Sequence, residues 1–336
     1  MLFSVIIPAY NASATIRRCL DSVFSLPFSE SEYEVIVIDD CSTDQTVGIL
    51  SYYCSRYHNI TVLEQPENHR QGAARNRGLS LAKGEYVVFL DSDDELAVGL
   101  TAALALAEKK NLEMVASKAI TSSINGEVLS DFRLPYNEET IFTGKELQTN
   151  HPFWCTAPWG YVYKRSFLLS VNYPFFEDVL YEDSDFVSIH LYRANRMGYS
   201  NALGYIQHEN PVSTTHTISY KSVCDYALLG ARLLSFYEKI DDKDSTFADT
   251  ILEGGSWNIM RSCKRLFKLE SYKEIVLFYD RFDSFSNRAA LLRYDKPSYC
   301  WTSWTRFCLK HKSMTIFAVG TMLSTGMNHI LKKVLK

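Results

Sequence analysis

The sequence predicts a doubly wound, mostly parallel α/β sheet with an appended helical C-terminal region. Three observations lead to this fold class. Short, continuous apolar runs recur through the first 120 residues, as expected for parallel strands covered on both faces. Stretches of helical composition alternate with these runs, and the strand–helix–strand order implies right-handed crossovers. Beyond about residue 219 the pattern becomes typical of helices alone.

The expected strands are rich in β-branched and aromatic residues. They lie at 5–7, 35–38, 60–63, 86–90 and 114–116. The expected helices run from a cap at Ser13 to about Phe24, from a cap at Ser42 or Thr43 to about Tyr57, over 71–82 with Gly84 just past the end, and over 100–109. The apolar N-terminal segment reads as the first strand, because it is too short for a signal peptide and lacks a basic leader. Loops and short antiparallel strands are expected over 121–218.

Composition excludes several classes of protein. Apolar residues make up 46% and charged residues 22% of the chain, as in ordinary globular proteins. None of the eight cysteines forms a C-x-x-C pair, which disfavours a zinc site or a redox motif. Scattered free thiols fit a reducing compartment, so we expect a cytoplasmic protein.

The charges are distributed unevenly. Residues 296–336 carry seven Lys or Arg and no acid, whereas the remaining chain carries 28 basic and 39 acidic residues. The apolar run 314–327 in this tail is too short to span a membrane. Two interpretations stay open: peripheral contact with an anionic membrane, which sedimentation with liposomes tests, or a helix packed on the domain or on a second copy of the chain. No nucleic-acid-reading motif accompanies the basic residues.

Acidic residues follow two of the expected strands, at the edge where doubly wound sheets bind ligands. Neither G-x-G-x-x-G nor a P-loop is present, so dinucleotide binding is disfavoured. Asp91 and Asp93 are spaced to share a Mg²⁺ or Mn²⁺ ion that also contacts substrate phosphates. The alternative is that Ser92, Asp93 or Asp94 caps the helix expected over 96–109.

Several motifs agree in order and spacing. SVIIPAYN, VIVIDDCSTD and NHRQGAARNRGLSLAKGEYVVFLDSDD resemble the inverting family 2 glycosyltransferases with the GT-A fold. The segments APWGYVYKRSFL, YEDSDF and YIQHENPVSTT extend the resemblance to about residue 218. It implies a GT-A catalytic domain over 1–218, with a nucleotide-binding half at 1–112 and an acceptor-binding half at 113–218. The helical region over 219–336 carries no such motif.

The resemblance also implies roles for individual residues. The nucleotide is expected to contact Pro8, Ala9, Tyr10, Asp39, Asp40, Arg75, Asp91 and Ser92. Among these, Asp40 accepts from the base N–H, and Arg75 lies against the base and phosphates unless it is a solvated helix residue. Mn²⁺ or Mg²⁺ is expected on Asp93 and Asp91. His208 reaches the metal from a closing loop, or else is an ordinary surface histidine.

The implied reaction is one in-line displacement, which needs a single catalytic carboxylate. Asp183 matches the family's general base, Glu182 orients a substrate hydroxyl, and Asp185 is a less favoured base. The alternative is an acid-rich helix N-terminus. We therefore expect a metal-dependent hexosyltransferase that moves sugar from a UDP-sugar to a glycan or lipid-linked glycan of the cell surface, such as a capsule or cell wall. A catalytically silent sugar-nucleotide-binding subunit is the second reading.

Overall fold

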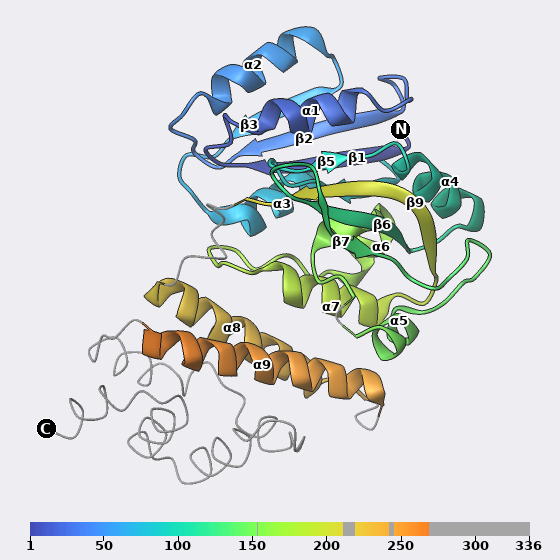
Figure 1. Cartoon of the computed structure of the whole chain (residues 1–336), viewed down its shortest axis with the longest axis vertical. Coiled ribbons are helices and arrows are strands. Elements are labelled where there is room, and N and C mark those ends of the chain that lie inside the picture. Colours follow the sequence, from blue (N-terminus) through green and yellow to red (C-terminus); the bar gives the residue numbers. More distant parts are fainter. Residues whose placement is uncertain (153, 211–218, 242–244, 269–336) are drawn as a thin grey trace, which may run out of the picture. The chain divides into compact units, whose positions relative to one another are not determined.

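The computed structural model describes residues 1–152, 154–210, 219–241 and 245–268 (Figure 1). The chain divides into two compact units, Met1–Val212 and Ser213–Lys336. The basic tail, with its expected membrane or oligomer contact, lies outside the described residues. Among the helices that are described, none has both the length and the apolar content needed to cross a bilayer.

The first unit is built on one nine-stranded sheet. Its strands are β1 (Phe3–Ala9), β2 (Tyr33–Asp39), β3 (Ile60–Glu64), β4 (Tyr86–Phe89), β5 (Glu95–Leu96), β6 (Met114–Ser122), β7 (Val128–Phe132), β8 (Tyr161–Lys164) and β9 (Met197–His208). They follow the order β3-β2-β1-β4-β8-β6-β9-β5, with β7 paired to β6. Strands β1 to β4 pair in parallel, and β8 joins β4 and β6 antiparallel.

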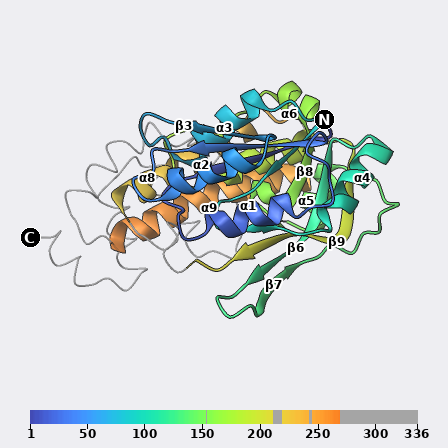
Figure 2. The same cartoon turned by 90° about the horizontal axis from the view of Figure 1, so that it is seen from above.

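Helices cover both faces of the parallel part. They are α1 (Ile16–Phe24), α2 (Thr46–Arg56), α3 (Arg70–Leu81) and α4 (Leu100–Lys110), and the later helices of this unit are α5 (Gly144–Asn150), η1 (Pro158–Gly160), α6 (Arg165–Val171) and α7 (Asp183–Arg193). Figures 1 and 2 show α1 and α2 on one face of β1–β3 and α3 on the other. This arrangement follows from right-handed crossovers, because the strand order reverses after β3.

The register of the central strands positions the site. Val5 of β1 is opposite Val35 of β2 and Val88 of β4, so the three strands end at one edge of the sheet. All seven residues of β1 are buried, which explains its uninterrupted apolar run. The predicted doubly wound α/β fold is confirmed in this half. The acids that follow β2 and β4 therefore stand two strands apart, on either side of β1.

Several local expectations are wrong. Helix α1 begins at Ile16 and α2 at Thr46, so Ser13, Ser42 and Thr43 do not cap them. Gly84 does not end α3, whose C-cap is Ala82. A Cβ on Gly84 would lie 2.4 Å from the carbonyl carbon of Phe3, so glycine allows the chain to approach β1.

Two further differences concern the region after β4. Helix α4 begins at Leu100 with Gly99 as its N-cap, so none of Ser92, Asp93 and Asp94 caps it. Residues Glu95–Leu96 instead form β5, which pairs with β9. Strand β9 is longer than the short strands expected here, with 12 residues, and it pairs in parallel with β6.

The described part of the second unit is a pair of helices, α8 (Tyr220–Tyr237) and α9 (Thr246–Lys268). Ser219 begins α8 with a capping box, because its hydroxyl accepts from the Ser222 N–H and the Ser222 hydroxyl accepts from the Ser219 N–H. A Cβ on Gly255 would lie 2.8 Å from Leu234 Cδ2, so the two helices pack closely at this glycine.

Candidate functional site

The loops after β1 and β2 are tied together by hydrogen bonds. The Asn11 N–H donates to Ser42 Oγ at 2.9 Å, and the Thr43 N–H donates back to Asn11 Oδ1 at 2.8 Å. The Ala12 N–H donates to Thr46 Oγ1 at 2.8 Å. Polar residues that resemble helix caps in the sequence therefore brace one loop against the other.

Asp44 strengthens this brace. Its carboxylate accepts from the Ser13 N–H at 3.1 Å and from the Thr46 N–H at 2.9 Å. Desolvation acts to raise the pKa of Asp44, but the hydrogen bonds from Ser13 and Thr46 outweigh it and lower the pKa to about 2. Asp44 is thus ionised at neutral pH, and its carboxylate oxygens accept the hydrogen bonds from the Ser13 and Thr46 N–H groups.

The three residues expected against the nucleotide base lie at the end of β1. Pro8 and Ala9 are buried within the strand, whereas Tyr10 follows it with 50% of its surface exposed. An exposed aromatic ring beside two braced loops offers a flat apolar face to a ligand.

Asp40, after β2, is buried and well supplied with donors. Its Oδ1 accepts from Gln65 Nε2 at 2.7 Å and from the His69 N–H at 2.8 Å, and its Oδ2 accepts from the Arg70 N–H at 2.7 Å. Arg70 has a positive φ of 71°, so the chain turns sharply at the start of α3 to present that N–H. Asp40 therefore anchors the beginning of α3, and its contact with a base N–H stays a prediction.

Asp39 has one oxygen to spare. Its Oδ2 accepts from the Ser42 N–H at 2.9 Å. Its Oδ1 is buried and has no hydrogen-bond partner among the described residues. A buried acceptor without a donor is costly, so this oxygen is available to a ligand N–H or O–H.

The turn after β4 concentrates negative charge. Asp94 is buried and accepts from the Tyr205 hydroxyl at 2.6 Å and from the His208 N–H at 2.8 Å, which fastens the turn to β9. Asp93 Oδ2 accepts from Asn210 Nδ2 at 2.9 Å. Burial and the charge of Asp91 raise the pKa of both Asp93 and Asp94. Ionisation of Asp93 and Asp94 in this turn is therefore less favourable than for an ordinary aspartate.

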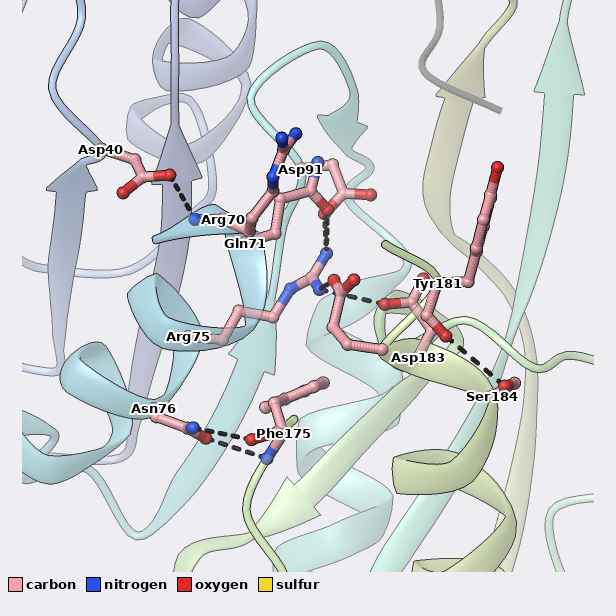
Figure 3. A network of polar contacts seen from close by, with 11 residues as sticks. Asp40, Arg70, Gln71, Arg75, Asn76, Asp91, Phe175, Tyr181, Asp183 and Ser184 are labelled. Carbon is pink, nitrogen blue, oxygen red and sulfur yellow. Dashed lines mark hydrogen bonds and ion pairs between the residues drawn. The ribbon is translucent and has the colours of Figure 1, made fainter. Parts of the chain in front are cut away.

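Arg75 lies at the centre of the site (Figure 3). Its side chain is fully buried on α3, and its guanidinium contacts Asp91 at 2.7 Å, Asp183 at 3.0 Å and the carboxylate of Glu182. Gln71 Oε1 accepts a further hydrogen bond from it at 3.0 Å. In this structure the guanidinium faces carboxylates rather than open solvent, so the interpretation of Arg75 as a solvated helix residue is wrong. Its predicted contact with base and phosphates stays a prediction.

The acids expected in catalysis lie at the start of α7. Glu182 is the N-cap and its side chain is 5% exposed, whereas that of Asp183 is 32% exposed. Partial burial and the neighbouring Glu182 raise the pKa of Asp183 well above its ordinary value, and the Arg75 charge opposes this shift. Asp185 is buried and accepts from the Tyr173 hydroxyl at 2.9 Å. Of the three acids, Asp183 is the most accessible.

The donor set fits a hard divalent cation. Asp91 and Asp93 provide carboxylate oxygens on one turn, where burial and the charge of Asp91 raise the pKa of Asp93. Mg²⁺ or Mn²⁺ commonly takes one or two carboxylates together with phosphate oxygens. Within the described ranges, no three His, Cys, Asp or Glu side chains form a complete metal cage. His208 Nε2 lies 2.6 Å from Glu95 Oε1, so its place on a metal stays a prediction.

The structure thus brings Asp91, Arg75, Glu182 and Asp183 into one contact network, with Asp93 on the same turn as Asp91. The Asp39–Asp40 pair lies two strands away and joins this network through the start of α3. Sequence reasoning missed Asn76 and Asn210. The Asn76 amide donates to the main chain of Phe175, and the Asn210 amide donates to the Asp93 carboxylate, each more than ninety positions away in the sequence. The one sequence signal for Asn76 is its position directly after Arg75 in the motif GAARNRG.

Comparison with known proteins agrees with this architecture. The family model "Glycosyl transferase family 2" matches residues 4–169. A poly(ribitol-phosphate) beta-glucosyltransferase from Bacillus spizizenii is 43% identical over 28% of this chain and 15% of its own length. The uncharacterized glycosyltransferase EpsJ from Bacillus subtilis is 31% identical over 67% of this chain and 65% of its own. The chain therefore spans less than two thirds of either relative.

Solved structures share the fold. TarS residues 1–349 from S. aureus, in complex with UDP-GlcNAc, superposes with a TM-score of 0.67 at 22% identity, covering 97% of this chain and 92% of that one. The mannosyltransferase PcManGT from Pyrobaculum calidifontis, in complex with GDP-Man and Mn²⁺, gives 0.53 at 19% identity over 95% and 86%. Residues 4–169 therefore form a family 2 glycosyltransferase domain, and the first unit has the GT-A fold.

Proposed function

We propose that the protein is a metal-dependent inverting glycosyltransferase. It moves a sugar from a nucleotide-sugar, most simply a UDP-sugar, to a hydroxyl of a glycan or lipid-linked glycan in cell-surface polysaccharide synthesis. One observation carries the proposal: Arg75 joins Asp91, at the end of β4, to Asp183, at the start of α7. A carboxylate suited to a cation on the donor diphosphate and a carboxylate suited to the acceptor thus belong to one contact network.

Asp183 is the group that takes the proton of the acceptor hydroxyl. It is the accessible acid of its segment, and its raised pKa makes it a better base than an ordinary aspartate. The deprotonated oxygen then attacks the anomeric carbon as the nucleoside diphosphate leaves from the opposite face. Because no second carboxylate is needed, the buried Glu182 acts through its ion pair with Arg75.

Residues of the first half bind the donor. Tyr10 offers a ring to the base, and Asp39 Oδ1 offers an acceptor. Asp91 and Asp93 would hold Mg²⁺ or Mn²⁺, which when bound neutralises charge on the leaving diphosphate. Support comes from the complexes of the structural neighbours, one with UDP-GlcNAc and one with Mn²⁺.

Release of UDP from UDP-GlcNAc and from UDP-glucose, with and without a poly(ribitol phosphate) acceptor, tests this function. The acceptor should accelerate release from one donor. Asp183→Asn should lower kcat by about 10²-fold or more while the affinity for UDP changes by less than about twofold, since only the base is lost. Glu139→Gln removes an exposed carboxylate and serves as the control.

Near-normal turnover by Asp183→Asn would show that another group is the base. UDP binding without release from any sugar nucleotide would favour the silent binding subunit instead.

A further inference from the structure

The segment from Phe175 to Glu182, here called the strap, leads directly into Asp183 and lies along α3. Asn76 holds its first residue with both ends of its amide. Asn76 Nδ2 donates to the Phe175 carbonyl oxygen at 2.9 Å, and Asn76 Oδ1 accepts from the Phe175 N–H at 2.9 Å (Figure 3). A single side chain thus replaces two backbone partners for a residue 99 positions further along the chain.

Other contacts keep the strap close to α3. A Cβ on Gly72 would lie 2.4 Å from the Phe176 carbonyl oxygen, so only glycine permits this approach. His69 Nδ1 lies 3.0 Å from Asp178 Oδ1 just before the helix. The strap is therefore placed by one face of α3, with Asn76 making the paired main-chain contact.

The Phe175 ring connects this contact to the reacting groups. The Arg75 guanidinium lies over the ring, 5.3 Å from its centre. The ring stacks on Phe186 at 3.7 Å and 8°, and Phe186 is on α7 one turn beyond Asp183. Movement of Phe175 would therefore displace the helix that carries Asp183, whereas Arg75 is also held by Asp91 and Gln71.

We propose that Asn76 is a positioning residue for sugar transfer. By fixing the main chain at Phe175, whose ring stacks on Phe186, it sets the place of the start of α7, and hence of the Asp183 carboxylate. The proposal rests on the proposed function of Asp183. Loss of Asn76 leaves the contacts of Arg75 with Asp91 and Gln71 in place, so it should affect turnover and leave nucleotide binding unchanged.

Kinetics provide the first readout. Asn76→Ala should lower kcat for acceptor-stimulated UDP release by about 10-fold or more, because displacement of a reacting group by about 1 Å costs up to 10²-fold. The Kd for UDP with Mn²⁺ should stay within about twofold of the wild-type value. Asn76→Asp keeps the acceptor, loses the N–H donors and faces Glu177, so it should not restore kcat.

Asn59→Ala is the matched control. Asn59 Nδ2 also donates to a main-chain oxygen, that of Tyr33 at 3.2 Å, but at the β2–β3 side of the sheet. It should keep the wild-type kcat while losing a hydrogen bond of the same kind. An equal fall in kcat for Asn59→Ala and Asn76→Ala would overturn the proposal, because both losses would then follow from general destabilisation.

Hydrogen–deuterium exchange provides a readout without turnover. Asn76→Ala should speed exchange over 175–184 and leave β1 and β2 unchanged. If the wild-type protein transfers no sugar, the proposed function fails while this structural result still stands. Unchanged exchange over the strap, a parallel loss of UDP affinity, or failure of both Asn76 variants to fold would overturn the positioning role.

Discussion

Asp40 follows β2 and Asp93 follows β4, the two strands that flank β1 in the sheet, yet the surroundings of the two acids are opposite. Asp40 receives hydrogen bonds from Gln65 and from the first N–H groups of α3. Asp93 lies beside Asp91, and burial together with that charge raises its pKa. Acidic residues at similar strand ends of one sheet thus have different roles. Asp40 stabilises the fold, whereas the fold holds Asp93 in place against the charge of Asp91, as expected of a ligand site.

Removal of the Asp40 carboxylate should have the largest effect on the free energy of unfolding. Asp40→Ala leaves the His69 and Arg70 N–H groups and the Gln65 amide without their acceptor. We expect a loss of about 3 kcal/mol or more in the free energy of unfolding, since each orphaned buried donor costs about 1–3 kcal/mol. Urea denaturation at pH 7 measures this. A loss below about 1 kcal/mol would remove the distinction between the two acids.

The pH dependence of kcat/KM at low pH tests the assignment of Asp183 as the base. Asp183 accepts a proton only when ionised, and its raised pKa keeps it protonated to a higher pH than an ordinary aspartate. The kcat/KM for UDP release should therefore rise with pH through an apparent pKa above about 3.9, the ordinary value for aspartate. A profile that stays flat down to pH 4 would contradict the raised pKa or the assigned base.

Removal of the Asp93 carboxylate should change the free energy of unfolding by a smaller amount and in the opposite direction. Asp93→Asn keeps the size of the side chain and removes its repulsion with Asp91. Without metal, the variant should be more stable than the wild-type protein by about 1 kcal/mol, within the range for like charges close together. Thermal unfolding in EDTA measures this difference. Destabilisation comparable to that of Asp40→Ala would show that both acids support the fold.

Much of the first half could be predicted from sequence because its information is local. Continuous apolar runs define β1 to β4, and the motifs at their ends name the acids. The predicted starts of α1 and α2 are wrong for a physical reason. Ser42 and Asp44 bond to Asn11 and Ser13 in the loop after β1, so groups that cap helices elsewhere are used between loops here.

The arrangement of the second half could not be predicted in the same way. The burial of Arg75 depends on Glu182 and Asp183, more than one hundred positions later in the chain. The Asn76 contact with Phe175 is similarly distant, and neither residue type signals it. Pairings of this kind arise from packing across the sheet, which periodicity and spacing do not encode.

The ligand-binding role of the turn that carries Asp91 and Asp93 is tested most directly by calorimetric titration of UDP with and without Mn²⁺. In the wild-type protein, Mn²⁺ should raise the affinity for UDP by about 10-fold or more, as expected for a cation shared by carboxylates and a diphosphate. Asp93→Asn should lose this gain, and Asp183→Asn should keep it. An equal gain in Asp93→Asn, or UDP affinity independent of Mn²⁺ in the wild-type protein, would contradict the assignment of the acidic turn to the donor diphosphate.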